Sequence, residues 1–471
     1  MKITFFYKGR YFLQDAVVTE TLSAIAKRYG HATALVYDQD IFGLSDNIIS
    51  SPALHWSFAN PKNFVKKVME TDPDLLVFYD AIHLNRNWIR ALLAGITQAG
   101  GCAKAVYLSC VETPDSEDFN FTLIGEPELT FDLFLRERQD LGSARVFRHP
   151  GVADLNGLPI PDKSLFDGYI DFKDSYLVFT SKGCPGRCSY CLETVLKDAM
   201  GAHYCRRRSP WHVLAELKAA KERYGIKEVI YKDSIFAINK DWLREYLPQY
   251  REQIALPFKC FAKAGSFDAE MARMLKESRC YCVEFGVQTF NESLKHNILA
   301  REEKNTAIQA AFAICDEYDL TYDADHLFGI PQESLEDHLT AAGIYAQLRR
   351  LNRIKCHNLV FYRHAKIFES SPVDIKNDSN YQADFFSSIA GSPDMRVINA
   401  CFQKYFKILP LLSTAANAFV RNKHRWKFFK FVPDGLIMAG MLILAMKNRD
   451  KRFRVYLKQY PRMIIRMIRG V

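Results

Sequence analysis

The sequence predicts an α/β protein with two successive series of alternating strands and helices, followed by a helical C-terminal region. Two observations support this fold class: short apolar runs alternate with segments of helical periodicity up to residue 375, and this alternation stops in residues 376–471. The length of 471 residues suits two or three domains. Hydrophobic residues at 48% and charged residues at 25% are ordinary globular values, which exclude a disordered or a collagen-like chain.

Residues 1–145 are expected to form a doubly wound parallel sheet. Parallel strands of one sheet need helical crossovers, and segments with helical periodicity separate the apolar runs in this part of the chain. The predicted strands are residues 3–6, 33–37, 75–79, 105–109 and 120–124, and the predicted helices include residues 19–29, 61–70 and 88–98.

Residues 146–174 are expected to be a linker, because a glycine and two prolines within residues 155–162 discourage a continuing helix. Residues 175–375 then alternate again, which predicts an open, partial (β/α)6 barrel with its functional groups at the carboxyl ends of the strands. The predicted strands are residues 176–181, 228–232, 258–262, 282–287, 321–328 and 355–361, and the predicted helices include residues 211–224, 268–278, 305–317 and 335–351.

The basic charge of the chain is concentrated at its C-terminal end. The whole chain has a net charge of +9, whereas residues 421–471 contain fourteen Lys and Arg against two Asp and thus carry +12. The other 420 residues are close to neutral at −3, so a nucleic-acid-binding body is disfavoured and no nucleic acid partner is expected.

The basic tail has the composition of a helix that lies on a membrane surface. Arg462, Arg466 and Arg469 share one helical face, beside methionine and isoleucine side chains that suit anionic lipid. The alternative is a C-terminal helix that packs on the barrel and exposes a basic side to solvent.

A cytoplasmic location is expected, with peripheral membrane contact through the tail. Residues 1–6 enter a strand without a signal sequence, and the longest charge-free apolar run, residues 435–446, is too short for the roughly 20 residues of a spanning helix. In a reducing compartment, clustered cysteines indicate metal binding or catalysis before disulfides.

Cys184, Cys188 and Cys191 form the strongest motif, a C-x3-C-x2-C segment directly after the first predicted barrel strand. Thiolates at this spacing can hold three corners of a [4Fe–4S] cluster and leave its fourth iron open to another ligand. One alternative is three incidental buried cysteines. A structural zinc site is less suitable, because the nearest further thiol, Cys205, lies 14 residues beyond Cys191 in a basic segment.

With this motif at the start of a partial barrel, residues 155–365 resemble the radical S-adenosylmethionine (SAM) superfamily. Further segments in the family's order support the resemblance, namely Leu-Pro-Ile-Pro-Asp at 158–162, Arg-Arg-Ser-Pro at 207–210, Tyr-Lys-Asp-Ser-Ile-Phe at 231–236, Glu-Phe-Gly-Val-Gln-Thr at 284–289 and His-Leu-Phe-Gly-Ile-Pro-Gln-Glu-Ser at 326–334. The family often has a second Asp where this chain has Ser234.

The resemblance implies roles for individual residues. The three cysteines would ligate the cluster, and its open iron would bind the amino and carboxylate groups of SAM. Gln288 would bind the ribose hydroxyls, Arg301 the SAM carboxylate, and Asp233 the substrate or SAM, with Gly286 and Gly329 as close-approach backbone positions. Arg301 could equally be a surface helix-cap residue and Asp233 an ordinary loop carboxylate. No catalytic residue is assigned beyond the cluster ligands.

The N-terminal part resembles the cobalamin-binding domain of B12-dependent radical SAM enzymes. The match is carried by a G-E-x-E-x-T motif made of Gly125, Glu126, Glu128 and Thr130. Two features depart from that group: no D-x-H-x-x-G motif follows the first strand, and residues 107–112 read Tyr-Leu-Ser-Cys-Val-Glu where relatives have a Gly-Gly turn.

The resemblance therefore predicts a radical SAM enzyme that cleaves SAM with a [4Fe–4S] cluster and, with cobalamin, methylates an unactivated carbon of a hydrophobic biosynthetic intermediate. It implies an external electron donor of the flavodoxin or ferredoxin type. A cobalamin-free radical cyclase or rearrangement enzyme is the alternative, and a non-catalytic iron–sulfur binding or regulatory protein is the alternative of a different class.

Overall fold

A computed structural model describes residues 1–9, 16–38, 60–101, 103–113, 118–137, 145–378, 381, 392–448, 458, 461 and 465. The chain divides into two compact units. The first unit comprises Met1–Phe172, Phe179–Pro185 and Leu192–Glu216, and the second comprises Lys173–Val178, Gly186–Cys191 and Leu217–Val471.

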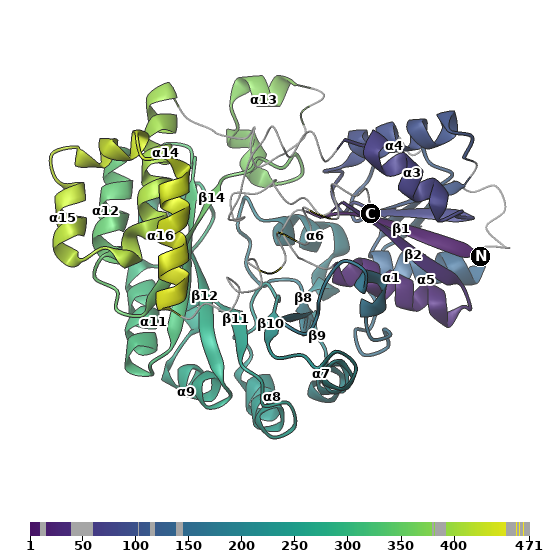
Figure 1. Cartoon of the computed structure of the whole chain (residues 1–471), viewed down its shortest axis with the longest axis horizontal. Coiled ribbons are helices and arrows are strands. Elements are labelled where there is room, and N and C mark those ends of the chain that lie inside the picture. The colour runs from purple at the N-terminus through teal and green to yellow at the C-terminus, as the bar shows by residue number, and fades with distance from the viewer. Residues whose placement is uncertain are drawn as a thin grey trace. The chain divides into compact units, whose positions relative to one another are not determined.

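The first unit is built on a six-stranded sheet in which every neighbouring pair of strands is parallel (Figure 1). The strand order β2-β1-β3-β4-β5-β6 reverses direction at β1, which makes the sheet doubly wound, as predicted. The strands are β1 (Lys2–Lys8), β2 (Ala32–Asp38), β3 (Leu75–Tyr79), β4 (Lys104–Ser109), β5 (Phe121–Gly125) and β6 (Val146–His149), and the helices are α1 (Val17–Arg28), α3 (Lys62–Glu70), α4 (Arg86–Gln98) and α5 (Pro127–Glu137).

Helices cover both faces of this sheet because its strands are apolar on both sides. Successive side chains of a strand point to opposite faces. Phe6 packs with Phe64 of α3 on one face, and its neighbour Phe5 meets Phe131 of α5 on the other, with ring centroids 6.0 Å apart.

The sixth strand, β6, adds to the five strands predicted for this part and lies in the segment expected to be a linker. It is only four residues long, and its sequence, Val-Phe-Arg-His, is half polar and only partly buried. A short edge strand of this kind needs no continuous apolar run, and for this reason the apolar pattern did not reveal it.

The second unit contains another six-stranded parallel sheet, with the sequential order β14-β13-β12-β11-β10-β7 (Figure 1). This confirms the predicted partial barrel, since β7 and β14 remain as the edges among the described strands. The strands are β7 (Tyr176–Val178), β10 (Val229–Tyr231), β11 (Phe258–Ala262), β12 (Cys280–Gln288), β13 (Thr321–Phe328) and β14 (Leu351–Asn358). The helices that follow them include α7 (Pro210–Tyr224), α8 (Lys240–Gln253), α9 (Ala269–Glu277), α10 (Glu292–Asn297), α11 (Asn305–Glu317) and α12 (Leu335–Tyr345).

The two faces of the barrel sheet differ in chemistry. One face packs on helices, as shown by Tyr322 of β13, whose ring stacks on Phe312 of α11 at a centroid distance of 4.7 Å. The other face carries ionisable side chains from four neighbouring strands. Because side chains alternate along a strand, residues such as Glu284 and Asp323 lie on one face while Phe285 and Tyr322 lie on the other.

The C-terminal region of the second unit is helical in its described part, which confirms the prediction. It includes α14 (Pro393–Ile408), α15 (Thr414–Arg421), the 3-10 segment η7 (Arg425–Lys430) and α16 (Asp434–Lys447). Helix α14 packs against β14, where Gln403 donates to Asn358 at 2.7 Å. No helix formed by the described residues combines the length and apolar composition that a membrane span requires. Arg462, Arg466 and Arg469, which form the predicted arginine face, lie outside the described residues.

Candidate functional site

The cysteine segment begins after β7 with a short strand, β8 (Ser181–Lys182), that pairs with β9 (Arg206–Arg207). Gly183 follows with φ +84°, and a Cβ there would lie 2.9 Å from the Cα of Cys205, so only glycine fits. Lys197 of α6 (Leu192–Met200) donates to the carbonyl oxygens of Cys184 and Pro185 at 3.0 and 3.1 Å. These contacts fix the backbone at the first cysteine.

The other end of the segment is anchored within the second unit. The backbone N–H of Cys191 donates to the carbonyl of Cys188 at 3.2 Å, which forms a tight turn between two of the cysteines. Ser189 donates through its N–H to the Leu299 carbonyl and through its hydroxyl to the Ile298 carbonyl, at 3.0 and 2.6 Å. Cys188 is thereby held beside the chain that leads into Arg301.

Arg301 connects the cysteine segment to the end of β12. Its Nη1 lies 3.8 Å from the Sγ of Cys188, and its Nη2 donates to the Gly286 carbonyl at 2.7 Å and to Glu303 at 2.6 Å. Burial disfavours the guanidinium charge, but Tyr190, Cys188 and Glu303 together raise the pKa of Arg301. The arginine is therefore a cation beside a half-buried thiol, and its side chain is only 14% exposed, unlike that of a surface helix cap.

Gly286 and Gln288 lie next to this guanidinium. Gln288 has φ +65°, and its amide nitrogen would be 2.8 Å from a Cβ placed on Gly286. That Cβ would also lie 3.7 Å from Nη1 of Arg301. The structure thus brings together three of the residues predicted to contact SAM. A guanidinium and an amide side by side can bind a carboxylate and a hydroxyl.

Asp233 stands at the same end of the sheet. It is buried and follows the last residue of β10, Tyr231, by two positions, whereas Gln288 is the last residue of β12. In a parallel sheet the carboxyl ends of all strands point to one edge, where ligands of such folds bind. The SAM-contacting roles of Asp233, Gly286, Gln288 and Arg301 remain predictions.

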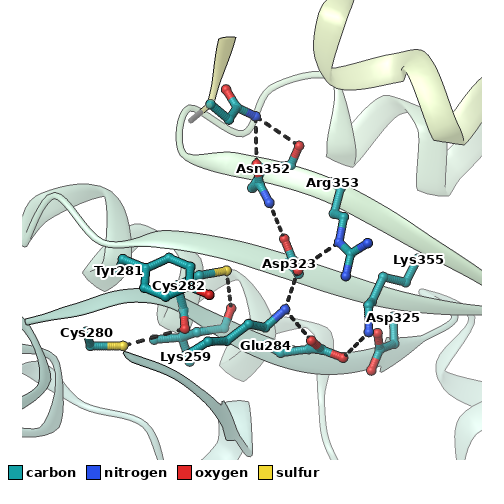
Figure 2. Close-up of polar contacts among 12 residues, drawn as sticks. Lys259, Cys280, Tyr281, Cys282, Glu284, Asp323, Asp325, Asn352, Arg353 and Lys355 are labelled. Atoms are coloured by element: carbon teal, nitrogen blue, oxygen red, sulfur yellow. Dashed lines mark hydrogen bonds and ion pairs between the residues drawn. The ribbon is translucent and has the colours of Figure 1, made fainter. Parts of the chain in front are cut away.

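A buried network of charges lies on the ionisable face of the barrel sheet (Figure 2). Lys259 of β11 forms ion pairs with Glu284 of β12 and with Asp323 of β13, the latter at 2.5 Å, and its side chain is 1% exposed. Two cations of β14 complete it: Lys355 contacts Glu284 at 2.7 Å, and Arg353 contacts Asp323 at 3.0 Å. Burial alone would raise the pKa of Glu284, but Lys259 and Lys355 hold it well below its usual range.

Asp325 differs from the other carboxylates of this face. Its Oδ1 accepts no hydrogen bond from the described residues, although His357 lies 3.8 Å away. Burial and the nearby negative charge of Glu284 raise the pKa of Asp325. Oδ1 of Asp325 is therefore a buried polar atom that no hydrogen bond from the described residues satisfies.

Gly125 and Glu126, predicted to contact cobalamin, have structural partners within the first unit. Gly125 has φ +136°, and a Cβ there would collide with the carbonyl oxygen of His149 in β6. Glu126 is buried, accepts from the Ala153 N–H at 2.5 Å and pairs with Lys182 and Arg206. These contacts are structural, and the role of Gly125 and Glu126 in binding a corrin remains a prediction.

The carboxyl end of the first sheet carries aromatic and sulfur-containing side chains. Cys110, which follows β4, packs with Met200 and Tyr204, and Tyr79 at the end of β3 lies against this cluster. A corrin bound to a doubly wound sheet would lie at this end. Part of the surface is thus already covered within the first unit.

The cysteine thiols fit an iron–sulfur cluster in their chemistry. Cys184, Cys188 and Cys191 are all partly exposed, and Cys188 receives a charged N–H donor from Arg301, as suits a thiolate ligand. Within the described part of the chain, no three His, Cys, Asp or Glu side chains stand close enough together to hold a metal ion. The assignment therefore rests on the spacing and the donor type.

Several residues of this site were not predicted from the sequence. Tyr190 and Glu303 contact Arg301, and Lys259, Asp323 and Lys355 form the charge network. A signal was available, because Glu284, Gly286 and Gln288 alternate along one strand and so share its ionisable face.

Comparison with known proteins gives a family match for part of the chain. Residues 178–342 match the radical SAM superfamily. An uncharacterized methyltransferase of Pyrococcus horikoshii is 24% identical over 195 residues, which are 40% of this chain and 41% of that protein. Cytidylyl-2-hydroxyethylphosphonate methyltransferase of Streptomyces wedmorensis is 27% identical over 114 residues, 24% of this chain and 20% of that one. The chain thus spans less than half the length of these relatives.

Among solved structures, the chain resembles the radical SAM methyltransferase TsrM of Kitasatospora setae. The match covers 78% of this chain and 74% of TsrM, with 15% identity and a TM-score of 0.57, in a structure with tryptophan substrate and a SAM analogue bound. A second TsrM structure, with cobalamin and a [4Fe–4S] cluster bound, matches with a TM-score of 0.56. The likeness shows that the two chains share a fold.

Proposed function

We propose that this chain, which contains a radical SAM domain in residues 178–342, is a cobalamin-dependent methyltransferase of a small molecule. Cys184, Cys188 and Cys191 would hold the [4Fe–4S] cluster, which when reduced would supply the electron that cleaves SAM into methionine and a 5′-deoxyadenosyl radical. Arg301, Gln288 and Gly286 would orient SAM, and the barrel would exclude water from the radical.

One observation carries this proposal: the fold likeness to TsrM extends over 78% of the chain and so reaches beyond the radical SAM domain. The six-stranded doubly wound sheet of the first unit is the kind of fold that binds a large cofactor at the carboxyl ends of its strands. The methyltransferase names of the sequence relatives support the same reaction class.

The test is anaerobic reconstitution of the full chain with iron and sulfide, with and without added cobalamin. We expect bound corrin by absorbance and mass spectrometry, and 5′-deoxyadenosine or S-adenosylhomocysteine from SAM after reduction. A protein that takes up the cluster but retains no corrin would refute the cobalamin-dependent proposal. A protein that reduces its cluster yet consumes no SAM would favour the non-catalytic iron–sulfur class.

A cobalamin-free radical enzyme, for example a cyclase, is the second candidate. The packing of Cys110 against Met200 and Tyr204 favours it, because these side chains occupy part of the surface on which a corrin would lie. Under this candidate, reconstituted protein cleaves SAM to 5′-deoxyadenosine at the same rate with and without cobalamin.

We further propose an external electron donor of the flavodoxin or ferredoxin type, a hydrophobic small-molecule substrate and peripheral contact of the basic tail with membranes. The donor follows from the need to reduce the cluster, and the substrate character from the family resemblance. Reduction by dithionite but not by flavodoxin or ferredoxin would refute the first. Equal turnover of polar and apolar substrate candidates would refute the second.

A further inference from the structure

Exposed apolar side chains are concentrated in one part of the C-terminal region, residues 419–447, which we term the C-terminal surface. Six of the twelve exposed large apolar residues among the described ones lie there. They are Phe419, Phe428, Phe431, Leu436, Ile443 and Met446, each at least half exposed. Single exposed apolar residues are common, but such a concentration on folded elements marks an interaction surface.

The 3-10 segment η7 separates an inward row of aromatic side chains from an outward row. Side chains three positions apart are eclipsed in a 3-10 helix. Trp426 and Phe429 point inward, with ring centroids 5.4 Å from those of Phe402 and Tyr405 of α14. Phe428 and, just past the end of η7, Phe431 are 68% and 76% exposed. The inward row holds the segment in place, so the outward phenylalanines are not needed for packing.

Helix α16 shows the same division. Ile437 and Leu444, seven positions apart, are buried, and a Cβ on Gly440 would lie 2.8 Å from Ile408 of α14. Leu436 and Ile443, also seven apart, lie about 100° around the helix from the buried pair, and they are exposed together with Met446. Helices α14 and α16 lie side by side in Figure 1 and are in contact.

Cations surround these apolar groups. Between residues 421 and 447 the chain has six Lys and Arg and a single acidic residue, Asp434, which pairs with Lys404 at 3.1 Å. The guanidinium of Arg425 stands 4.0 Å from the ring centre of Phe419. The exposed cations are Lys423, Arg425, Lys427, Lys430 and Lys447. The C-terminal surface therefore presents bulky apolar side chains surrounded by Lys and Arg side chains.

We propose that the C-terminal surface binds an anionic lipid bilayer, with Phe428, Phe431 and the exposed face of α16 among the lipid headgroups. Aromatic and aliphatic side chains insert at the headgroup boundary, while Lys and Arg meet the lipid phosphates. A two-fold contact with a second copy would bring two such basic surfaces together, which is repulsive. The proposal rests on the membrane contact proposed above for the basic tail and assigns that contact to folded elements rather than to the predicted arginine helix of residues 462–469. It does not depend on the proposed chemistry.

The test is sedimentation of the full chain with vesicles of phosphatidylcholine, with and without phosphatidylglycerol. We expect binding to the anionic vesicles that weakens with added salt. The double variant Phe428→Ser/Phe431→Ser should lower the partition coefficient about tenfold, given the apolar area removed from water on insertion. Lys427→Gln/Lys430→Gln should lower it about thirtyfold, since each of the two basic residues near an anionic surface is worth about 1 kcal/mol.

Val373→Ser is the matched control, because Val373 is 71% exposed but lies on α13 (Val373–Asn377), away from this segment of the chain. Its binding should equal that of the parent chain. Unchanged binding of both double variants would overturn the proposal and assign any lipid binding to the remaining tail. Loss of a dimer in Phe428→Ser/Phe431→Ser, without lipid binding by the parent, would overturn it in favour of self-association. SAM cleavage in solution does not use this surface. A variant chain that fails to cleave SAM would therefore still give the same vesicle-binding results.

Discussion

Arg301 lies between Cys188 and Glu303: one nitrogen of its guanidinium is 3.8 Å from the cysteine sulfur, and another is 2.6 Å from the glutamate. The side chain of Glu303 is 2% exposed, so its charge depends on this partner and on the Gly265 N–H that it also accepts at 2.7 Å. The pair ties the environment of a predicted cluster ligand to the stability of the barrel.

Removing the arginine should therefore destabilise the protein strongly. We expect Arg301→Ala to lower the free energy of unfolding by about 3–5 kcal/mol, because it leaves a buried carboxylate without its cation. The double variant Arg301→Ala/Glu303→Ala should lose less than the sum of the two single variants. Urea unfolding of all four proteins measures this, and additive effects would contradict it.

Each cysteine of the C-x3-C-x2-C motif should be required for the cluster. Cys184→Ala, Cys188→Ala and Cys191→Ala should each lose most of the iron and sulfide bound after anaerobic reconstitution, because a three-thiolate site loses a corner. Cys205→Ala is the control, since Cys205 is exposed and outside the motif, and it should keep the parent iron content. Full iron content in any of the three variants would refute its assignment as a ligand.

Lys259 should be a large contributor to stability at neutral pH. Lys259→Met is expected to cost about 3–5 kcal/mol, because Glu284 and Asp323 each lose a buried cation. The partly exposed Lys240, which pairs with Asp268, is the control, and Lys240→Met should cost less than about 1 kcal/mol.

The dependence of the free energy of unfolding on acid pH should also change in Lys259→Met. The pKa of Glu284 is lowered in the folded protein, so its contribution to stability is complete above the ordinary value of 4.5 and is lost as the pH falls through the folded value. Lys259→Met raises the folded value, so we expect a shallower loss of stability below pH 4.5. An acid profile parallel to that of the parent would contradict this account.

Glu333 should destabilise the protein as it ionises. Burial raises its pKa to about 7, although the N–H groups of Gly329 and Asn399 that donate to it oppose this shift. For a carboxyl with a raised folded pKa, the cost appears as the pH rises above 4.5 and is complete above about 7.

Glu333→Gln keeps the accepting oxygen and removes the charge. We expect it to raise the free energy of unfolding by about 1–3 kcal/mol at pH 8, with the gain shrinking to nothing near pH 4.5. Chemical unfolding at several pH values measures this. A gain that is constant with pH would show that the effect does not come from ionisation.

Elements with a clear apolar or helical pattern were predicted closely. Strands β11 and β13 and helix α11 have the predicted bounds. Strand β14 was predicted at 355–361 but runs from Leu351 to Asn358, because the buried run at 359–361 lies beyond the strand. Its inward positions carry Arg353 and Lys355, which interrupt the apolar pattern that sequence reasoning follows.

The charge network could not be predicted in the same way. Its pairs join four strands, and their register shifts between Phe258 and Lys259, between Gly286 and Gln288 and between Tyr322 and Asp323. The contact of Arg301 with Cys188 spans 113 residues and depends on Ser189 binding the backbone at Ile298 and Leu299. Such details are set by tertiary packing, which a local pattern does not encode.

The hydrogen bonds of Asn399 have a consequence for how the protein unfolds. This buried side chain of α14 donates to Glu333 and accepts from His338 at 2.8 Å, so the C-terminal helices share polar partners with the segment after β13 and with α12. Detaching α14 would leave those groups unsatisfied in an apolar setting. The C-terminal helices and the barrel should therefore melt in a single cooperative transition, and proteases should find no stable intermediate in which only the helices have come away.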